Sequence, residues 1–326
     1  MKLFIHIGLP KTAVTTFSYL FETSNEINFL GRPLDPIYEN IWQSMMFDND
    51  KKYKKKLIRE NQNILNSLSK KKVNILLIEG ITDPLFSINK VDYIKRLKLL
   101  KDTLKPKVQI KILFVIRNQA DFIFSRFIES PKFFQNYNKK WMNFEIIKNT
   151  FKKKKMERKS KNFYVYFNFY KICRELVSSF GKKNVNFLLY EQIKYEKKIF
   201  SRKLSNILGI SYKNINNIFL KNTLNQSVRI KKNIFISKKY QLNNIIIDNF
   251  IYKKVNKKIP RNLKFLIKNL IIKIDKFFYK FIIIFLPNYK IEMNEQERYL
   301  IRKFFCIDNK KLEKSFKINL KKYNYY

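Results

Sequence analysis

Glycine, cysteine, histidine and acidic residues are all scarce in this chain of 326 residues. Its two cysteines, Cys173 and Cys306, stand far apart and outside any CxxC spacing, which excludes a disulfide framework and a cysteine zinc site and indicates a reducing compartment. The single histidine, His6, has no neighbouring carboxylates or cysteines at the spacing of metal ligands. We therefore expect neither a disulfide scaffold nor a bound metal.

Long apolar runs are missing as well. Only residues 3–5 form an apolar run before a polar motif, which is too short for the apolar part of a signal peptide, so we expect a cytoplasmic protein. Residues 271–286 are interrupted by three lysines and Asp275, and so fall short of the about 20 apolar residues that span a bilayer. Two interpretations of residues 263–286 remain open. The segment is either a helix packed against its own domain or a basic amphipathic helix that contacts a membrane surface.

Acidic residues are outnumbered by basic ones, 25 against 69, and the formal net charge is +44. Such a charge is typical of proteins that meet nucleic acid, an anionic membrane or an anionic substrate. Only 12 of the basic residues are arginine, however, and arginine is the residue that reads bases through bidentate contacts. The excess therefore favours a solvated lysine surface, and we expect no nucleic-acid partner.

The apolar residues that are present, 45% of the chain with 16% aromatic, can fill a core and exclude intrinsic disorder. Short continuous apolar runs alternate with helical patterns up to about residue 228, which predicts buried parallel strands. Gly181 and Gly209 each follow a helical pattern and are expected to end a helix. The expected strands are residues 3–7, 75–79, 110–116 and 185–189, with a weaker one at 27–30.

These patterns predict an α/β domain over residues 1–228, with a doubly wound, mainly parallel sheet of about five strands flanked by helices. From residue 229 to residue 326 the strand signal stops, and the chain becomes rich in lysine with helical apolar periodicity. Leu300, Phe304 and Leu312 carry this periodicity near the end. We expect this region to be helical and to pack on, or extend, the same domain.

The first candidate site is HIGLPKTAVTT, residues 6–16, between the first predicted strand and the first helix. A strand-to-helix junction presents backbone N–H groups and the positive end of the helix dipole, and so can cradle a phosphate. Lys11 adds a charge and the threonines add hydroxyl donors. A Walker A loop needs a glycine directly before the lysine, which this loop lacks, so an ordinary ATPase or kinase is disfavoured.

The second candidate site is ILFVIRNQADFIFS, residues 112–125, which places Arg117 at the carboxyl end of a predicted strand and Ser125 on the next helix.

The first loop, residues 6–16, resembles the 5′-phosphosulfate loop of sulfotransferases that use 3′-phosphoadenosine 5′-phosphosulfate (PAPS), whose bacterial members commonly read HIGxPKT[GA]TT. The family's second motif is an arginine at a strand end and a serine eight residues later, both holding the 3′-phosphate. Arg117 and Ser125 match that motif, and both would lie where ligands of open α/β sheets bind.

Further stretches are similar to the same family: YEQI at residues 190–193, a helix ending in ILG at 207–209, Asn225-Gln226-Ser227, and a closing helical segment at 297–323. Residues 230–290 have no counterpart. Val14 departs from the pattern, because the family usually has the first of two adjacent threonines there; Thr15 and Thr16 are available to compensate. The resemblance implies a P-loop-like sulfotransferase fold and these PAPS-binding residues: Gly8, Pro10, Lys11, Thr12, Ala13, Val14, Thr15, Thr16, Arg117, Ser125, Asn225 and Ser227.

The resemblance also implies a metal-independent transfer of a sulfuryl group to a hydroxyl acceptor, which by analogy with bacterial members is a carbohydrate or glycan. Lys11 would stabilise the bridging oxygen of the leaving phosphate. An acceptor hydroxyl needs a base within reach, and Glu79, at the end of a predicted strand, is the first choice. Glu39 and His6 are the other candidates.

Two functions of other classes stay open. A P-loop kinase-like phosphotransferase would need a Mg²⁺ partner and the missing Gly-Lys pair. A non-enzymatic basic module would bind nucleic acid or an anionic membrane through its charge, and its affinity would fall steeply with salt.

Overall fold

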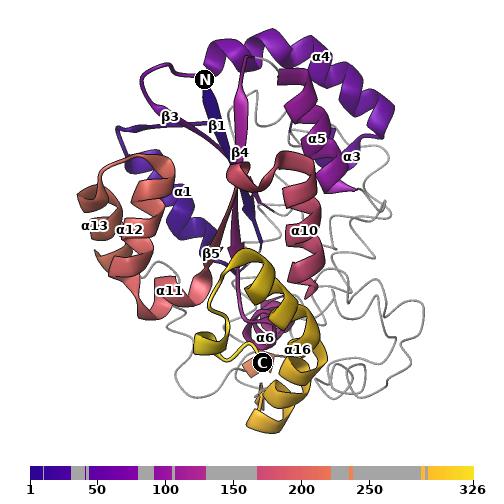
Figure 1. The fold of residues 1–326 in the computed structure, drawn as a ribbon, viewed down its shortest axis with the longest axis vertical. Coiled ribbons are helices and arrows are strands. Elements are labelled where there is room, and N and C mark those ends of the chain that lie inside the picture. The colour runs from indigo at the N-terminus through magenta and orange to yellow at the C-terminus, as the bar shows by residue number, and fades with distance from the viewer. Residues whose placement is uncertain are drawn as a thin grey trace. The chain divides into compact units, whose positions relative to one another are not determined.

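The computed structural model describes residues 1–9, 11–30, 41, 44–79, 92–104, 107–129, 167–221, 235–237, 288–290 and 293–326 (Figure 1). The chain divides into two compact units. The first unit comprises Met1–Asn225 together with Asn294–Tyr326, and the second comprises Gln226–Met293. The last 33 residues, Asn294–Tyr326, therefore belong to the unit that holds the main sheet.

The main sheet has five strands in the order β2-β3-β1-β4-β5, all parallel. Continuous apolar runs form these strands because both faces of the sheet are covered, and β1 and β4 are almost wholly buried. The predicted fold class and all five predicted strands are confirmed. The strands are β1 (Lys2–Gly8), β2 (Ile27–Phe29), β3 (Val73–Glu79), β4 (Gln109–Ile116) and β5 (Val185–Leu189).

One face of the sheet is covered by α1 (Val14–Thr23), α11 (Tyr190–Tyr195), α12 (Lys197–Leu208) and α13 (Tyr212–Lys221) (Figure 1). Aromatic rings fill this layer: Phe17 on α1 packs edge-on against Phe200 and Phe219, with centroids 6.0 and 5.7 Å away. Gly209 ends α12 at φ 72°, a left-handed conformation that glycine adopts without steric cost, as predicted.

The other face carries α3 (Ser44–Phe47), α4 (Asp50–Ser67), α5 (Tyr93–Leu104) and α10 (Phe169–Phe180), with α5 in contact with both α4 and α10 (Figure 1). Gly181 follows α10 at φ 83° as its predicted C-cap, before a short 3₁₀ turn at Lys182–Asn184.

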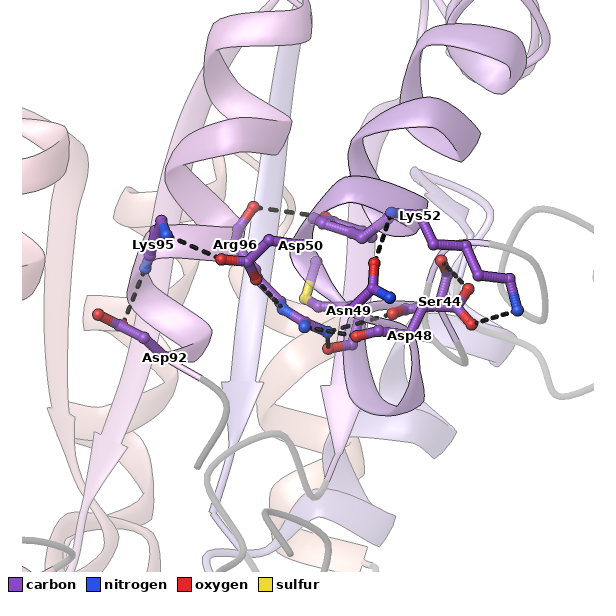
Figure 2. Close-up of polar contacts among 10 residues, drawn as sticks. Ser44, Asp48, Asn49, Asp50, Lys52, Asp92, Lys95 and Arg96 are labelled. Atoms are coloured by element: carbon purple, nitrogen blue, oxygen red, sulfur yellow. Dashed lines mark hydrogen bonds and ion pairs between the residues drawn. The ribbon is translucent and has the colours of Figure 1, made fainter. Parts of the chain in front are cut away.

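A buried arginine ties α5 to the turn between α3 and α4. Arg96 is 3% exposed, and its guanidinium donates to the backbone carbonyls of Ser44, Met45 and Asp48. It also donates from Nε to the Asp50 carboxylate at 3.2 Å, as Figure 2 shows. One side chain thus satisfies carbonyls at the end of α3 that no helical N–H reaches.

The remaining helices of the first unit are α6 (Gln119–Glu129), which follows β4, and α16 (Glu295–Phe316), which packs against α6 and α10. Asn294 and Glu297 form a capping box at the start of α16. After α16 the chain returns through a 3₁₀ turn, Lys321–Tyr323, to the region where β4 and β5 end.

The second unit contains β6 (Phe235–Ser237) and β7 (Asn288–Lys290), which pair antiparallel. The expectation that the region from residue 229 onward is helical is confirmed by α16 and is wrong at these two strands. Three-residue strands are too short to show an alternating apolar pattern, so a periodicity argument passes over them. Within the described part of the chain, no helix has the length and apolar character required to cross a membrane.

Candidate active site

The carboxyl ends of β1 and β4 meet at the centre of the sheet. From β1 the chain passes through α1 to the edge strand β2, whereas from β4 it leads through α10 to β5 on the opposite side. The connections of these two neighbouring strands therefore diverge, and such a switch point is where open α/β sheets bind ligands. The two sequence motifs follow β1 and β4 respectively, so the topology brings them to this point.

The loop after β1 has an unusual backbone. Lys11 and Ala13 both have positive φ, 66° and 65°, in the left-handed region that costs a non-glycine residue about 1–2 kcal/mol. Thr12, between them, is fully buried, and its hydroxyl donates to the Leu9 carbonyl at 2.7 Å. The surrounding structure therefore holds this loop in one strained shape, as is common at functional sites.

The N-terminus of α1 has no side-chain cap. Ala13 is the N-cap residue and provides no side-chain cap, and the first turn contains no acidic residue. By contrast, α4, α10 and α16 are capped by the side chains of Asn49, Asn168 and Asn294. The N–H of Thr16 in this first turn donates to the Ala13 carbonyl at 2.9 Å. The first-turn N–H groups together carry the positive end of the helix dipole. This N-terminus can therefore bind a phosphate through backbone N–H groups.

The side chains of the first turn face different ways. Thr15 is exposed and Lys11 is half-buried, whereas Thr16 is 5% exposed and Val14 is 6% exposed. Val14 packs into the aromatic core beside Phe17. Of the two threonines expected to compensate for Val14, only Thr15 presents its side chain to solvent.

Arg117, the residue directly after β4, reaches the first loop. Its Nη1 donates to the backbone carbonyl of Lys11 at 2.6 Å, and its guanidinium lies 4.5 Å from the centroid of the Tyr190 ring. A half-buried arginine held by a carbonyl and an aromatic face keeps further N–H donors in a fixed fork, which suits a phosphate. Two motifs 106 residues apart are thereby joined at the switch point.

A buried carboxylate lies beside this arginine. Glu191 is 5% exposed; it accepts from the backbone N–H of Asn118 and from the hydroxyl of Tyr325, both at 2.8 Å. Burial raises the pKa of Glu191, and the two hydrogen bonds and the charge of Arg117 oppose that rise. The carboxylate therefore adds electrostatic stabilisation to Arg117 as well as holding the turn that follows it.

Ser125 lies on α6, the helix that begins two residues after Arg117. It is the seventh residue of α6 and half-buried, which places it about 9 Å along the helix axis from Gln119 at about 1.5 Å per residue. Among the described residues, no hydrogen bond joins Ser125 to Arg117. The structure thus brings Lys11 and Arg117 together and leaves Ser125 nearly two turns along α6.

The candidate bases have different positions. Glu79 is the last residue of β3, and its backbone is the register partner of Gly8, so it enters the switch point next to the first loop. Its side chain is outside the described part of the chain. Glu39, Pro10, Asn225 and Ser227 also lie outside the described residues.

His6, the third candidate base, lies in the core instead of the site. Its ring is fully buried, 4.5 Å from the centroid of Phe17, and neither ring nitrogen has a hydrogen-bond partner in the described residues. Burial lowers the pKa of His6 to about 3. A neutral imidazole enclosed by aromatic rings cannot reach an acceptor hydroxyl, so the structure removes His6 from the candidates.

Sequence reasoning missed three polar residues near the site: Asn118, Asn309 and Tyr325. Asn309 is 1% exposed; it exchanges hydrogen bonds with Gln119 and donates to the Tyr325 carbonyl at 2.9 Å. No local pattern marks these residues, because a polar residue in a helix or a tail is ordinarily exposed. The one sequence feature that pointed to this network was Glu191, which lies in a stretch similar to a family motif.

No protein-family model matches the sequence, and no curated protein matches it either. Among solved structures, a sulfotransferase from Alicyclobacillus acidocaldarius is similar, with a TM-score of 0.49 and 12% identity. The match covers 98% of this chain and 96% of that one. A likeness this distant does not by itself carry over an activity.

Proposed function

We propose that this protein is a sulfotransferase that moves a sulfuryl group from PAPS to a hydroxyl of an acceptor, which we take to be a carbohydrate or glycan. The observation that carries the proposal is the hydrogen bond from Arg117 to the Lys11 carbonyl, which couples two phosphate-binding motifs at the switch point of the sheet. A donor with phosphates at both the 5′ and 3′ positions needs two anion sites side by side. The uncapped α1 and Arg117 are candidates for those two sites.

In this proposal the first loop holds the 5′-phosphosulfate. Lys11 stabilises the bridging oxygen on which negative charge develops as the sulfur–oxygen bond to the phosphate breaks. The acceptor oxygen forms the new bond to sulfur, and its proton passes to a carboxylate, for which Glu79 remains the first choice and Glu39 the second. Arg117 and Ser125 are assigned to the 3′-phosphate. Positioning and charge stabilisation supply the catalysis, as in phosphoryl transfer.

The loop itself weighs against the phosphotransferase alternative. Lys11 follows Pro10, where a Walker A loop has glycine, and the turn into α1 is made by Ala13. The binding module alternative rests on the net charge and on the basic region after residue 229, and it predicts affinity without any preference for a particular phosphate position.

The test is binding of adenosine 3′,5′-bisphosphate and 5′-AMP by calorimetry at about 0.15 M salt. We expect the bisphosphate to bind at least about tenfold more tightly, because Arg117 offers a charge-assisted fork to the additional phosphate. Lys11→Ala should weaken both nucleotides. Arg117→Lys should remove most of the preference while retaining the charge.

Two surface variants serve as matched controls. Arg202 is exposed on α12 and also lies over a tyrosine ring, 5.7 Å from the centroid of Tyr212, so Arg202→Lys repeats the arginine change away from the site. Lys182 is exposed just before β5, at the amino end of the sheet, so Lys182→Ala repeats the loss of a lysine. Equal, salt-sensitive binding of both nucleotides, with all four variants alike, would replace the proposal with the binding module.

A further inference from the structure

We infer that Tyr325 and Glu191 are positioning residues for the anion site at Arg117, so that the C-terminal segment after α16 sets how well the site holds a 3′-phosphate. This inference rests on the proposed function. It concerns the turn between β4 and α6, which carries Arg117 at its start and leads to Ser125.

The first step is the hydrogen bond at the turn itself. The backbone N–H of Asn118, the residue after Arg117, donates to one oxygen of Glu191 at 2.8 Å. The side-chain oxygen of Asn118 accepts from the Ala120 N–H at 3.0 Å and so caps the start of α6. Both ends of the turn are therefore fixed by side-chain groups that are themselves buried.

The C-terminal segment after α16, called the tail below, contacts both Glu191 and Asn118. The hydroxyl of Tyr325 donates to the other oxygen of Glu191 at 2.8 Å, and the ring is fully buried. The side-chain amide of Asn118 donates to the carbonyls of Tyr323 and Asn324, at 3.2 and 2.9 Å. The tail is thus hydrogen-bonded to the peptide that follows Arg117 both directly and through Glu191.

Asn309 holds both the tail and the start of α6 in place. Asn309 on α16 fixes the Tyr325 carbonyl and is itself paired with Gln119, the first residue of α6. The side chains of Asn118, Gln119, Glu191, Asn309 and Tyr325 are all buried, and away from water a satisfied hydrogen bond is strong and an unsatisfied one is costly. A change at Tyr325 therefore acts on the Arg117 turn, although Tyr325 itself is assigned no contact with the nucleotide.

The test compares Tyr325→Phe with Tyr326→Phe. Tyr326 donates its hydroxyl to Glu313, so both variants lose one hydroxyl–carboxylate hydrogen bond from neighbouring positions, but only Tyr325 is linked to the β4–α6 turn. We expect Tyr325→Phe to reduce the preference for adenosine 3′,5′-bisphosphate over 5′-AMP about tenfold, a factor that corresponds to about 1.4 kcal/mol. Tyr326→Phe should leave the preference unchanged.

Two substitutions of Glu191 separate the role of its hydrogen bonds from a general loss of packing. Glu191→Gln retains an acceptor for the Asn118 N–H and a donor toward the Tyr325 hydroxyl, so it should keep most of the preference, whereas Glu191→Ala should lose it. An equal loss of affinity for both nucleotides in Tyr325→Phe, or an unchanged ratio, would overturn the inference.

A second readout needs no ligand. In ¹⁵N NMR of protein labelled at arginine, the Nε–H signal of Arg117 should shift in Tyr325→Phe and stay in place in Tyr326→Phe. If the wild type showed no nucleotide preference, the proposed function would fail, while this signal would still decide the positioning role. An Arg117 signal that is the same in wild type and both variants would refute that role.

Discussion

Replacing His6 with leucine should change how the stability of the protein depends on pH. His6 is fully buried beside Phe17 and Phe21, with ring centroids 4.5 and 6.0 Å away, and burial lowers its pKa to about 3. In the unfolded chain the pKa of histidine is about 6.5. Below pH 6.5 His6 therefore binds a proton in the unfolded state but not in the folded state.

The sign follows from proton linkage. The contribution of neutral His6 to stability is fully present above pH 6.5 and is lost as the pH falls toward about 3, at about 1.4 kcal/mol per pH unit. Between pH 7.5 and pH 5.5 the integrated loss is about 1.4 kcal/mol. His6 is the chain's only histidine, so no other histidine contributes in that window.

The assay is urea unfolding followed by circular dichroism at pH 7.5, 6.5 and 5.5, for wild type and His6→Leu. Leucine fills a similar volume and removes two buried nitrogens that have no partner in the described residues, so the variant should also be more stable at every pH. The two proteins share every other ionisable residue, so the difference between the two stability curves isolates His6. Parallel curves from pH 7.5 to 5.5 would refute the reasoning.

Three further substitutions test the packing and the first loop. Arg96→Lys should lower the free energy of unfolding by about 3 kcal/mol, measured in urea, because an ammonium has three donors on one atom, whereas the guanidinium reaches four acceptors, the carbonyls of Ser44, Met45 and Asp48 and the Asp50 carboxylate. Ala13→Val should cost about 2 kcal/mol and weaken nucleotide binding, because a β-branched residue does not tolerate φ 65°, whereas Ala13→Gly should be tolerated; thermal unfolding and calorimetry would show both. Asn294→Ala should cost about 1 kcal/mol through the lost capping box of α16, and an unchanged melting temperature would contradict this.

The sheet was predictable because its strands are buried on both faces. Continuous apolar runs such as residues 110–116 have no polar positions to disturb the pattern, and β4 is observed at Gln109–Ile116. Gly181 and Gly209 were predictable as helix ends because each takes a positive φ that other residues avoid. Strand order was not predictable from these runs, since it depends on which strands pair across long sequence separations.

The buried face of α16 was predicted correctly at Leu312 and one residue too early at its other two apolar positions. The apolar periodicity favoured Leu300 and Phe304, whereas the buried face carries Ile301 and Phe305. That face also buries Glu297 and Asn309, which are polar and hide the stripe from a hydrophobicity pattern. Glu297 is held by the local capping box at the start of α16, whereas the burial of Asn309 depends on a tertiary partner, the side-chain amide of Gln119.

The candidate site also has one feature that the sequence predicts and others that it does not. The convergence of the Lys11 loop with Arg117 was predictable, because both follow strands whose carboxyl ends share one edge of the sheet. The hydrogen bond of Arg117 to the Lys11 carbonyl, and the Glu191 to Tyr325 contact behind it, were not, because they depend on side-chain packing across 106 and 134 residues.

The most direct measurement of the central claim is ³¹P NMR of adenosine 3′,5′-bisphosphate titrated with the protein. The nucleotide has two phosphorus atoms with separate resonances, so each proposed anion site has its own signal. We expect both resonances to shift in the wild type, Lys11→Ala to reduce the 5′ shift selectively, and Arg117→Lys to reduce the 3′ shift selectively. Resonances that stay in place at saturating protein, or that respond equally to Lys182→Ala, would contradict a two-phosphate site at the ends of β1 and β4.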